Sequence, residues 1–370
     1  MISNTGHMEP LLRIVTACAV ALGLSIGLHA QLIVNQTQPP TTLVQNVLLG
    51  SGVFASNVTF NGYPGGSIPA GEEGGRFARF NGSSSNVGLA GGILLFTGDA
   101  TYAIGPNDEE IVGAGGFPFN ATPDLDLSQI SGYDFWQVSG GNNVYNKSIL
   151  EFDFIPMFDM VSFRYVFSSE EYERWTCLDY NDSFGFFLSG PDISGPFQNN
   201  AINLATVPGS LAPVGVNSVN SGMVPNNANG GNALDPFAGC FAADPNWMNN
   251  TEYYIYNGSW VQGLQGGAQT EPPYCCDPYY IQANGLTVVL QATAAVQCGQ
   301  QYHMKLAIGN VGDWRVPSGV FIEQGSFTSS DRFDMDVAPG PNVEFTANDT
   351  TFIESDCDSV YLRFHRLGGF

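Results

Sequence analysis

Apolar residues recur at every second position in many short segments of this chain, and this period constrains the fold more than any other feature. In residues 161–167 (VSFRYVF), the odd-numbered positions are apolar or aromatic. Residues 148–155 alternate in the same way, with acidic side chains on the opposite face. Because successive side chains of a strand point to opposite faces of a sheet, both segments are predicted to be strands. Residues 156–159 (PMFD) then read as a hairpin connection between them.

Further strands are predicted by the same pattern, and no segment has the pattern of a long amphipathic helix. The additional predicted strands are residues 53–60, 92–97, 184–188, 202–207, 253–256, 286–292, 302–308 and 319–327. Residues 286–290 (LTVVL) are apolar on both faces, which predicts a central strand. Many short strands in one chain predict an all-β fold, a two-sheet, jelly-roll-like sandwich.

Composition agrees with strands joined by turns. The chain has 45 glycines and 22 prolines, and only 12% of its residues are charged. Helical bundles need more alanine, glutamate, lysine and leucine. Two Gly/Asn-rich segments, residues 208–239 and 258–269, are predicted to be long surface loops, which is where binding sites often lie on a β-scaffold.

The first 30 residues have the features of a secretory signal peptide. Arg13 precedes an apolar run at residues 14–28, which is short for a membrane span, and Ala30 is a suitable residue before a cleavage point. We therefore expect the mature protein to begin at Gln31. The rest of the sequence has no stretch that could span a membrane, so the expected location is secreted or at the cell surface.

The charge of the chain limits its partners. A net charge of −23, with Lys147 and Lys305 as the only lysines, repels nucleic-acid phosphates and anionic lipids. Nucleic acid is therefore excluded as an expected partner. Strong acidity suits solubility in salty surroundings, or the collection of divalent cations.

The C-terminal part is predicted to begin a further unit. Residues 329–342 are polar and contain proline and glycine, as in a junction between domains. Residues 343–346 and 360–366 resemble strands, but a pair of strands cannot bury a core alone. We expect residues 31–328 to form the main β-domain, residues 343–370 to be the truncated start of another extracellular β-domain, and further domains to follow Phe370.

Six cysteines follow the signal peptide, and in an exported chain they are expected to form disulfides. They are Cys177, Cys240, Cys275, Cys276, Cys298 and Cys357. Zinc is disfavoured because only two histidines remain after the signal peptide and no C-x-x-C occurs. Six cysteines allow many pairings. We expect Cys240 to pair with Cys275 or Cys276, closing the loop-rich insert, and Cys177 to pair with Cys298.

The segment at residues 166–191 (VFSSEEYERWTCLDYNDSFGFFLSGP) concentrates carboxylates and aromatic residues. Adjacent residues on a strand point to opposite faces, so Glu170 and Glu171 would not act together as a catalytic pair. Ser168 and Glu171 fit an S-x-x-E capping box at the start of a short helix. A role as metal ligands is the alternative to this structural interpretation.

Calcium is the metal that these residue types favour, because their ligands are oxygen atoms. The candidate ligands are Glu170, Asp179, Asp182 and Asp313. The same aspartates also fit turns stabilised by side-chain hydrogen bonds, and the spacing lacks the glycine and distal glutamate of an EF-hand loop.

Catalytic signals are weak throughout the chain. His303 lies inside a predicted strand, where a structural role is favoured over that of a general base, and no G-x-S-x-G, H-E-x-x-H or P-loop motif occurs. We therefore assign no catalytic residue and no cofactor other than a possible calcium ion, and expect a protein that is not an enzyme.

An ordered series of motifs resembles the choice-of-anchor L domain of bacterial exported proteins, common in Bacteroidetes. The motifs include residues 47–50 (VLLG), 95–98 (LFTG), 163–172 (FRYVFSSEEY), 181–191 (NDSFGFFLSGP), 202–209 (INLATVPG), 216–220 (VNSVN) and 318–327 (SGVFIEQGSF). The resemblance covers about residues 43 to 328. Pro317 stands where an aspartate is expected before Ser318, and Asn284 stands where one is expected before Gly285, which weakens the case for a cation here.

The resemblance implies a secreted or surface-attached module within a longer protein, held by a C-terminal anchor such as a type IX secretion signal. We expect a non-enzymatic module for adhesion or ligand binding, whose partner is an extracellular ligand, a glycan or a neighbouring surface protein. The alternative is a secreted carbohydrate-active hydrolase or its carbohydrate-binding module, which would need two facing carboxylates in a pocket.

Overall fold

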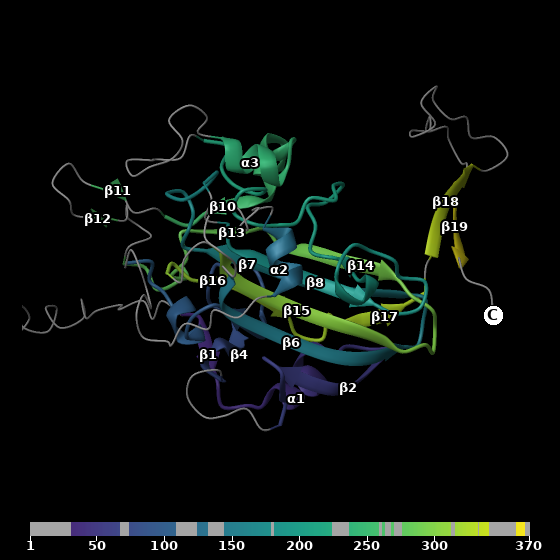
Figure 1. Ribbon diagram of the computed structural model, residues 1–370. Helices are drawn as coiled ribbons and strands as arrows, with labels where there is room; N and C mark the ends of the chain where they lie inside the picture. Colours follow the sequence, from purple (N-terminus) through teal and green to yellow (C-terminus); the bar gives the residue numbers. More distant parts are fainter. Residues whose placement is uncertain are drawn as a thin grey trace, which may run out of the picture.

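In the computed structural model, two antiparallel sheets pack face to face (Figure 1), which confirms the predicted all-β sandwich. The residues described are 31–66, 74–108, 124–131, 144–178, 181–223, 237–258, 261–262, 268–269, 276–311, 315–331, 333–339 and 360–366. The predicted signal peptide, residues 1–30, lies outside them.

The larger sheet has nine strands and is centred on β7. Its strands run in the order β1 (Ile33–Asn35), β4 (Phe77–Asn81), β5 (Gly91–Phe96), β16 (Ser318–Glu323), β7 (Met160–Ser169), β13 (Gly285–Thr287) and β10 (Tyr254–Tyr256). Two more strands, β14 (Leu290–Ala295) and β17 (Thr328–Ser330), also pair with β7.

The smaller sheet has six strands, in the order β3 (Tyr63–Pro64), β2 (Val53–Phe60), β6 (Val144–Pro156), β15 (Tyr302–Val311), β8 (Ser183–Ser189) and β9 (Ile202–Asn203). The short helices include α1 (Pro40–Leu43), α2 (Leu125–Ile130), α3 (Ala238–Ala243) and a 3-10 helix at Trp247–Tyr253. Two separate pairs of strands are β11 (Val261–Gln262) with β12 (Ala268–Gln269), and β18 (Phe333–Pro339) with β19 (Val360–Arg366).

An aromatic core fills the space between the two sheets. The odd-numbered residues of β7 predicted to be buried face this core, and Phe163 and Phe167 contact β8. The ring centroids of Phe163 and Phe186 are 4.8 Å apart, and those of Phe167 and Phe184 are 4.9 Å apart. Such pairs stabilise the contact between sheets beyond the apolar area they bury.

The nine-stranded sheet is also buried on its other face. A second cluster there includes Val166, Leu286, Phe80 and Phe321, and the rings of the last two lie 5.0 Å apart at nearly right angles. This explains why β5 (GGILLF) and residues 286–290 are apolar on both faces. A sheet covered on both sides needs near-continuous apolar strands.

Several predicted connections differ from the structure. Residues 156–159 are not a hairpin, because β6 belongs to the smaller sheet and β7 to the larger one, so this segment crosses between the sheets. The apolar pattern of residues 286–292 is divided between β13 and β14, and only the first two residues of 202–207 are strand.

The predicted junction at residues 329–342 contains two strands. Ser329 is buried in β17, and residues 333–339 form β18, which pairs with the predicted strand at residues 360–366. Residues 343–346 lie outside the described part of the chain.

Candidate functional site

The loop cap comprises residues 170–178, 214–223 and 237–256, which are loops, short helices and the edge strand β10 next to the ends of β7 and β13. It includes α3, which lies above β10 and β13 in Figure 1. Residues 214–223 belong to the predicted Gly/Asn-rich loop, whose residues 224–236 lie outside the described part. Hydrogen bonds from asparagine side chains and one disulfide hold the three segments together.

The disulfide of the loop cap joins Cys177 to Cys240, with 4.5 Å between their Cα atoms. Both predicted pairings are therefore wrong. Cys177 follows the end of β7, whereas Cys298 follows β14, whose last residue pairs with the first residue of β7. A ten-residue strand of roughly 30 Å separates these two cysteines, much too far for a disulfide.

The remaining cysteines are only partly described. Cys298 is an exposed free thiol, which donates a hydrogen bond to the Met157 carbonyl. Cys276 is disulfide-bonded, and Cys275 and Cys357 lie outside the described residues.

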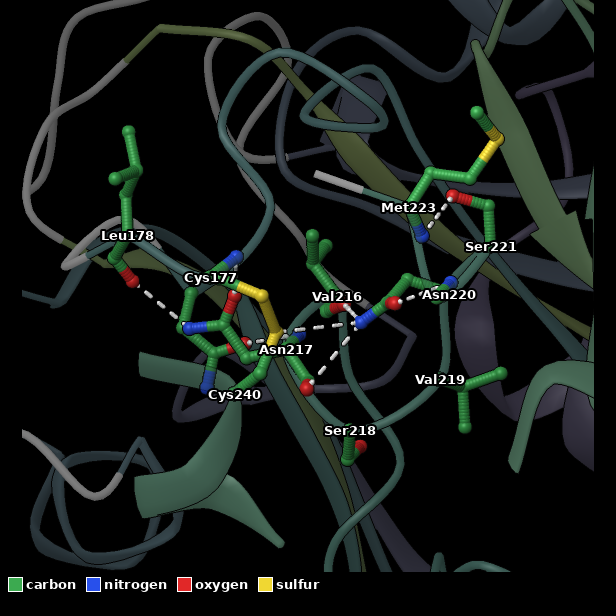
Figure 2. The surroundings of a disulfide bond; sticks show 12 residues. Cys177, Leu178, Val216, Asn217, Ser218, Val219, Asn220, Ser221, Met223 and Cys240 are labelled. Atoms are coloured by element: carbon green, nitrogen blue, oxygen red, sulfur yellow. Dashed lines mark hydrogen bonds between the residues drawn. A yellow bond between two sulfur atoms is a disulfide. The ribbon is translucent and has the colours of Figure 1, made fainter. Parts of the chain in front are cut away.

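Two asparagines bracket the disulfide, as Figure 2 shows. The Asn217 side chain accepts a hydrogen bond from the Cys177 amide at 2.6 Å and donates one to the Leu178 carbonyl at 2.8 Å. The Asn220 side chain donates to the Val216 carbonyl at 3.0 Å and to the Cys240 sulfur at 3.4 Å. Side-chain amides thus satisfy backbone groups that no sheet or helix satisfies here.

An aromatic cluster covers the disulfide. Trp247 is almost fully buried and packs beside Phe237, with ring centroids 5.5 Å apart, and Phe241 contacts it edge-on at 6.1 Å. Phe241 is nonetheless 49% exposed, and Met223 and Met248 are 68% and 57% exposed. The cap therefore combines a fixed interior with apolar side chains at its surface.

Glu173 links two further parts of the cap. Its carboxylate accepts hydrogen bonds from the Tyr254 hydroxyl at 2.7 Å and the Ser221 hydroxyl at 2.8 Å. Burial, and then the Glu173 carboxylate, raise the pKa of the Tyr254 phenol well above its usual value, so Tyr254 stays a hydrogen-bond donor.

The predicted capping box does not form. Ser169, not Ser168, accepts the hydrogen bond from the Glu171 amide, at 2.9 Å, and residues 170–178 form turns, not a helix. The chain leaves β7 at Ser169, so its hydroxyl is the one that lies beside the turn. The Glu171 carboxylate accepts a hydrogen bond from the Asp182 amide at 3.1 Å, which ties the turn to the start of β8.

The four predicted calcium ligands are not all described. Asp179 and Asp313 lie outside the described residues. Glu170 and Asp182 are both buried, and Asp182 accepts hydrogen bonds from the Val311 amide and the Ser318 hydroxyl. Within the described ranges, no group of three or more histidine, cysteine, aspartate or glutamate residues is arranged to hold a metal ion. Calcium binding stays a prediction.

His303 lies on the outer face of the smaller sheet, away from the loop cap. Its ring nitrogens contact Glu151 at 3.4 Å and Asp153 at 2.9 Å, across the pairing of β15 with β6. The hydrogen bond to Glu151, and then that to Asp153, raise the pKa of His303 against the opposite effect of burial. The predicted structural role is consistent with this ion-pair arrangement.

Lys305 belongs to a buried ion-pair group that the sequence analysis did not identify. Its Nζ lies 2.7 Å from Asp124 and 2.8 Å from Asp126, two residues at the start of α2. Burial alone lowers the pKa of Lys305, but the attraction and hydrogen bonds of the two aspartates raise it above its usual value. In the sequence, the one indication of this ion-pair group is a lysine within a predicted strand, in a chain that has two lysines.

Comparison with known proteins identifies the family of this chain. The family model of the choice-of-anchor L domain matches residues 33–328. The chain belongs to the choice-of-anchor L family. Neither the curated proteins nor the solved structures gave a match.

Membership in the choice-of-anchor L family points to an exported module anchored at the cell surface, and it confirms the resemblance seen in the motifs. In the described part of the structure, no helix has the length and apolar character needed to cross a membrane.

Proposed function

We propose that this choice-of-anchor L module is non-enzymatic and mediates adhesion, with the loop cap binding a neighbouring surface protein outside the cell. The observation that carries the proposal is the exposure of Met223, Phe241 and Met248 on a cap whose interior is fixed by the Cys177–Cys240 disulfide. Family membership supports an extracellular setting for this surface.

A protein partner fits these side chains better than a charged ligand. Methionine and aromatic residues are enriched in protein interfaces, whereas lysine, glutamate and aspartate are depleted there. The disulfide and the asparagine hydrogen bonds order the cap before it binds, and this reduces the entropy lost on association. The Glu173 carboxylate is engaged by Tyr254 and Ser221, so it supports the cap from within.

The test compares two variants in which serine replaces an exposed phenylalanine. Phe241→Ser removes an exposed ring from the cap, and Phe54→Ser removes a 65% exposed ring from β2 in the other sheet. Beads coated with the purified chain are incubated with intact cells of the organism that produces the protein, and with protease-treated cells of the same kind. We expect retention on intact cells, loss of retention after protease treatment, and weaker retention for Phe241→Ser but not for Phe54→Ser.

Other outcomes reject the proposal. Retention that survives protease treatment but is abolished by glycosidases would identify a glycan as the ligand. Release of sugars from a glycan mixture, abolished by substitution of a carboxylate, would show that the chain is the hydrolase considered as the alternative. Equal retention by both variants would place the binding surface outside the cap.

A further inference from the structure

A second group of reactive side chains lies outside the loop cap, on the outer face of the six-stranded sheet. Lys305 projects from β15 toward α2, and its Nζ is in hydrogen-bond contact with one carboxylate oxygen of Asp124 and one of Asp126. The three side chains are 11%, 9% and 3% exposed, respectively. An amine and two carboxylates are thus held together in a nearly dry site.

The surroundings fix the orientation of both carboxylates. The second carboxylate oxygen of Asp126 accepts a hydrogen bond from the backbone N–H of Gln198 at 2.8 Å. The second carboxylate oxygen of Asp124 accepts one from the backbone N–H of Leu127 at 3.0 Å. The Phe187 ring lies against the amine, with its centroid 5.4 Å from Nζ. Reacting groups held in contact behave as if at very high concentration.

We propose that Lys305 and Asp126 form an intramolecular amide bond, with Asp124 transferring the protons. The Lys305 nitrogen attacks Cγ of Asp126, so that a C–N bond forms and the bond from Cγ to Oδ2 breaks. The ammonium group gives up two protons, which pass through the Asp124 carboxylate to the departing oxygen. That oxygen leaves as water, and Asp124 is returned to its starting state.

The reaction balances without any other reagent, because an ammonium and a carboxylate become one amide and one water. Asp124 contacts the amine directly, which is the geometry that proton transfer requires. The backbone N–H of Gln198 donates to Oδ1 of Asp126, the oxygen on which negative charge develops during the attack. Asp126 is the more buried of the two carboxylates, so water is least able to return there and reverse the reaction.

The bond would connect positions 179 residues apart and fasten α2 to a central strand of the smaller sheet. Reducing agents would not break it, unlike the disulfide of the cap. This inference does not depend on the function proposed for the loop cap, because the two groups of residues are separate.

Digestion after lysine tests the proposal, since Lys147 and Lys305 are the only two lysines. The full chain is reduced, denatured and cut with a lysine-specific protease. With the amide bond, cleavage after Lys305 is blocked, and the fragments on either side of Lys147 stay joined through residues 126 and 305. The intact mass is then lower by one water than the mass calculated for the same chain with reduced cysteines.

Variants assign the roles. Asp126→Ala and Asp124→Asn should both restore the full mass and cleavage after Lys305, whereas Lys147→Arg should leave the loss of water unchanged. The wild-type digest decides even if a variant does not fold. Full mass with cleavage after both lysines overturns the proposal and leaves an ion pair only. Loss of water that persists in Asp126→Ala rejects Asp126 as the reacting carboxylate, and persistence in Asp124→Asn rejects proton transfer by Asp124.

Discussion

Asp182 and Ser318 join the two sheets of the sandwich, because the Ser318 hydroxyl donates a 2.6 Å hydrogen bond to the Asp182 carboxylate. Asp182 directly precedes β8 of the smaller sheet, and Ser318 begins β16 of the larger one. The other Asp182 oxygen accepts a hydrogen bond from the Val311 amide, at the end of β15. One buried carboxylate therefore holds the ends of three strands.

Removing this carboxylate should destabilise the protein strongly. Asp182→Ala leaves the buried Val311 amide and Ser318 hydroxyl without these acceptors, and we expect the free energy of unfolding to fall by roughly 3 kcal/mol. Asp108→Ala, at an exposed position, is the control and should change it by no more than about 0.5 kcal/mol. Urea denaturation measures both values. Equal effects of the two substitutions would contradict the structural role.

The two serines of the SSEEY motif should differ in importance. The Ser169 hydroxyl accepts from the Glu171 amide and pairs with the Ser318 hydroxyl at 2.8 Å, whereas Ser168 makes one long contact of 3.4 Å with the Gly319 carbonyl. Ser169→Ala should therefore lower the unfolding free energy by about 1 to 2 kcal/mol, and Ser168→Ala by less. Thermal melts of both variants give the ranking. The reverse order would restore the capping-box interpretation.

The strands were predictable because their signal is local. The predicted strand at residues 53–60 coincides with β2, and that at residues 302–308 lies within β15. Alternation records which face of a strand is buried, but it does not record which sheet the strand joins. For that reason residues 156–159 were mistaken for a hairpin.

The contacts of the site could not be predicted, because they join residues distant in sequence. Cys177 meets Cys240 only because the turn after β7 passes beneath α3. Asp124 and Asp126 are brought to Lys305 by the packing of α2 on the smaller sheet, and neither aspartate belongs to a recognisable motif. The carboxylates of Glu170, Glu171 and Asp182 were noticed, but their burial, which decides their role, has no signature in the sequence.

Stability should depend on the protonation of His303. Its pKa is raised in the folded protein, chiefly by Glu151 and Asp153, so its stabilising contribution is complete below the usual value of 6.5. The contribution is lost as the pH rises through the higher folded-state pKa. The pKa of Asp153 is lowered from 3.8 despite the opposing effect of burial. Asp153 therefore stabilises the folded protein above pH 3.8, and this contribution is lost as the pH falls through the lower folded-state pKa.

We therefore expect the melting temperature to decline as the pH rises above about 6.5, and His303→Gln to reduce that decline. The effect should be small, because the His303 side chain is 36% exposed and solvent weakens the ion pairs. Thermal melts at intervals of pH, with and without the substitution, provide the measurement. Identical slopes for the two proteins would show that another group titrates in this range.

The disulfide should contribute most to the order of the loop cap. Cys177 and Cys240 are 63 positions apart. Closing a loop of that size lowers the entropy of the unfolded chain, which raises the free energy of unfolding by roughly 4 kcal/mol. The double variant Cys177→Ser/Cys240→Ser should lose stability of this order, and limited proteolysis should cut first within residues 237–256. Cys298→Ser, at the exposed free thiol, is the matched control and should melt like the wild type. If the double variant melts like this control and its cap resists protease, the asparagine hydrogen bonds and the packing of Trp247 hold the cap without the disulfide.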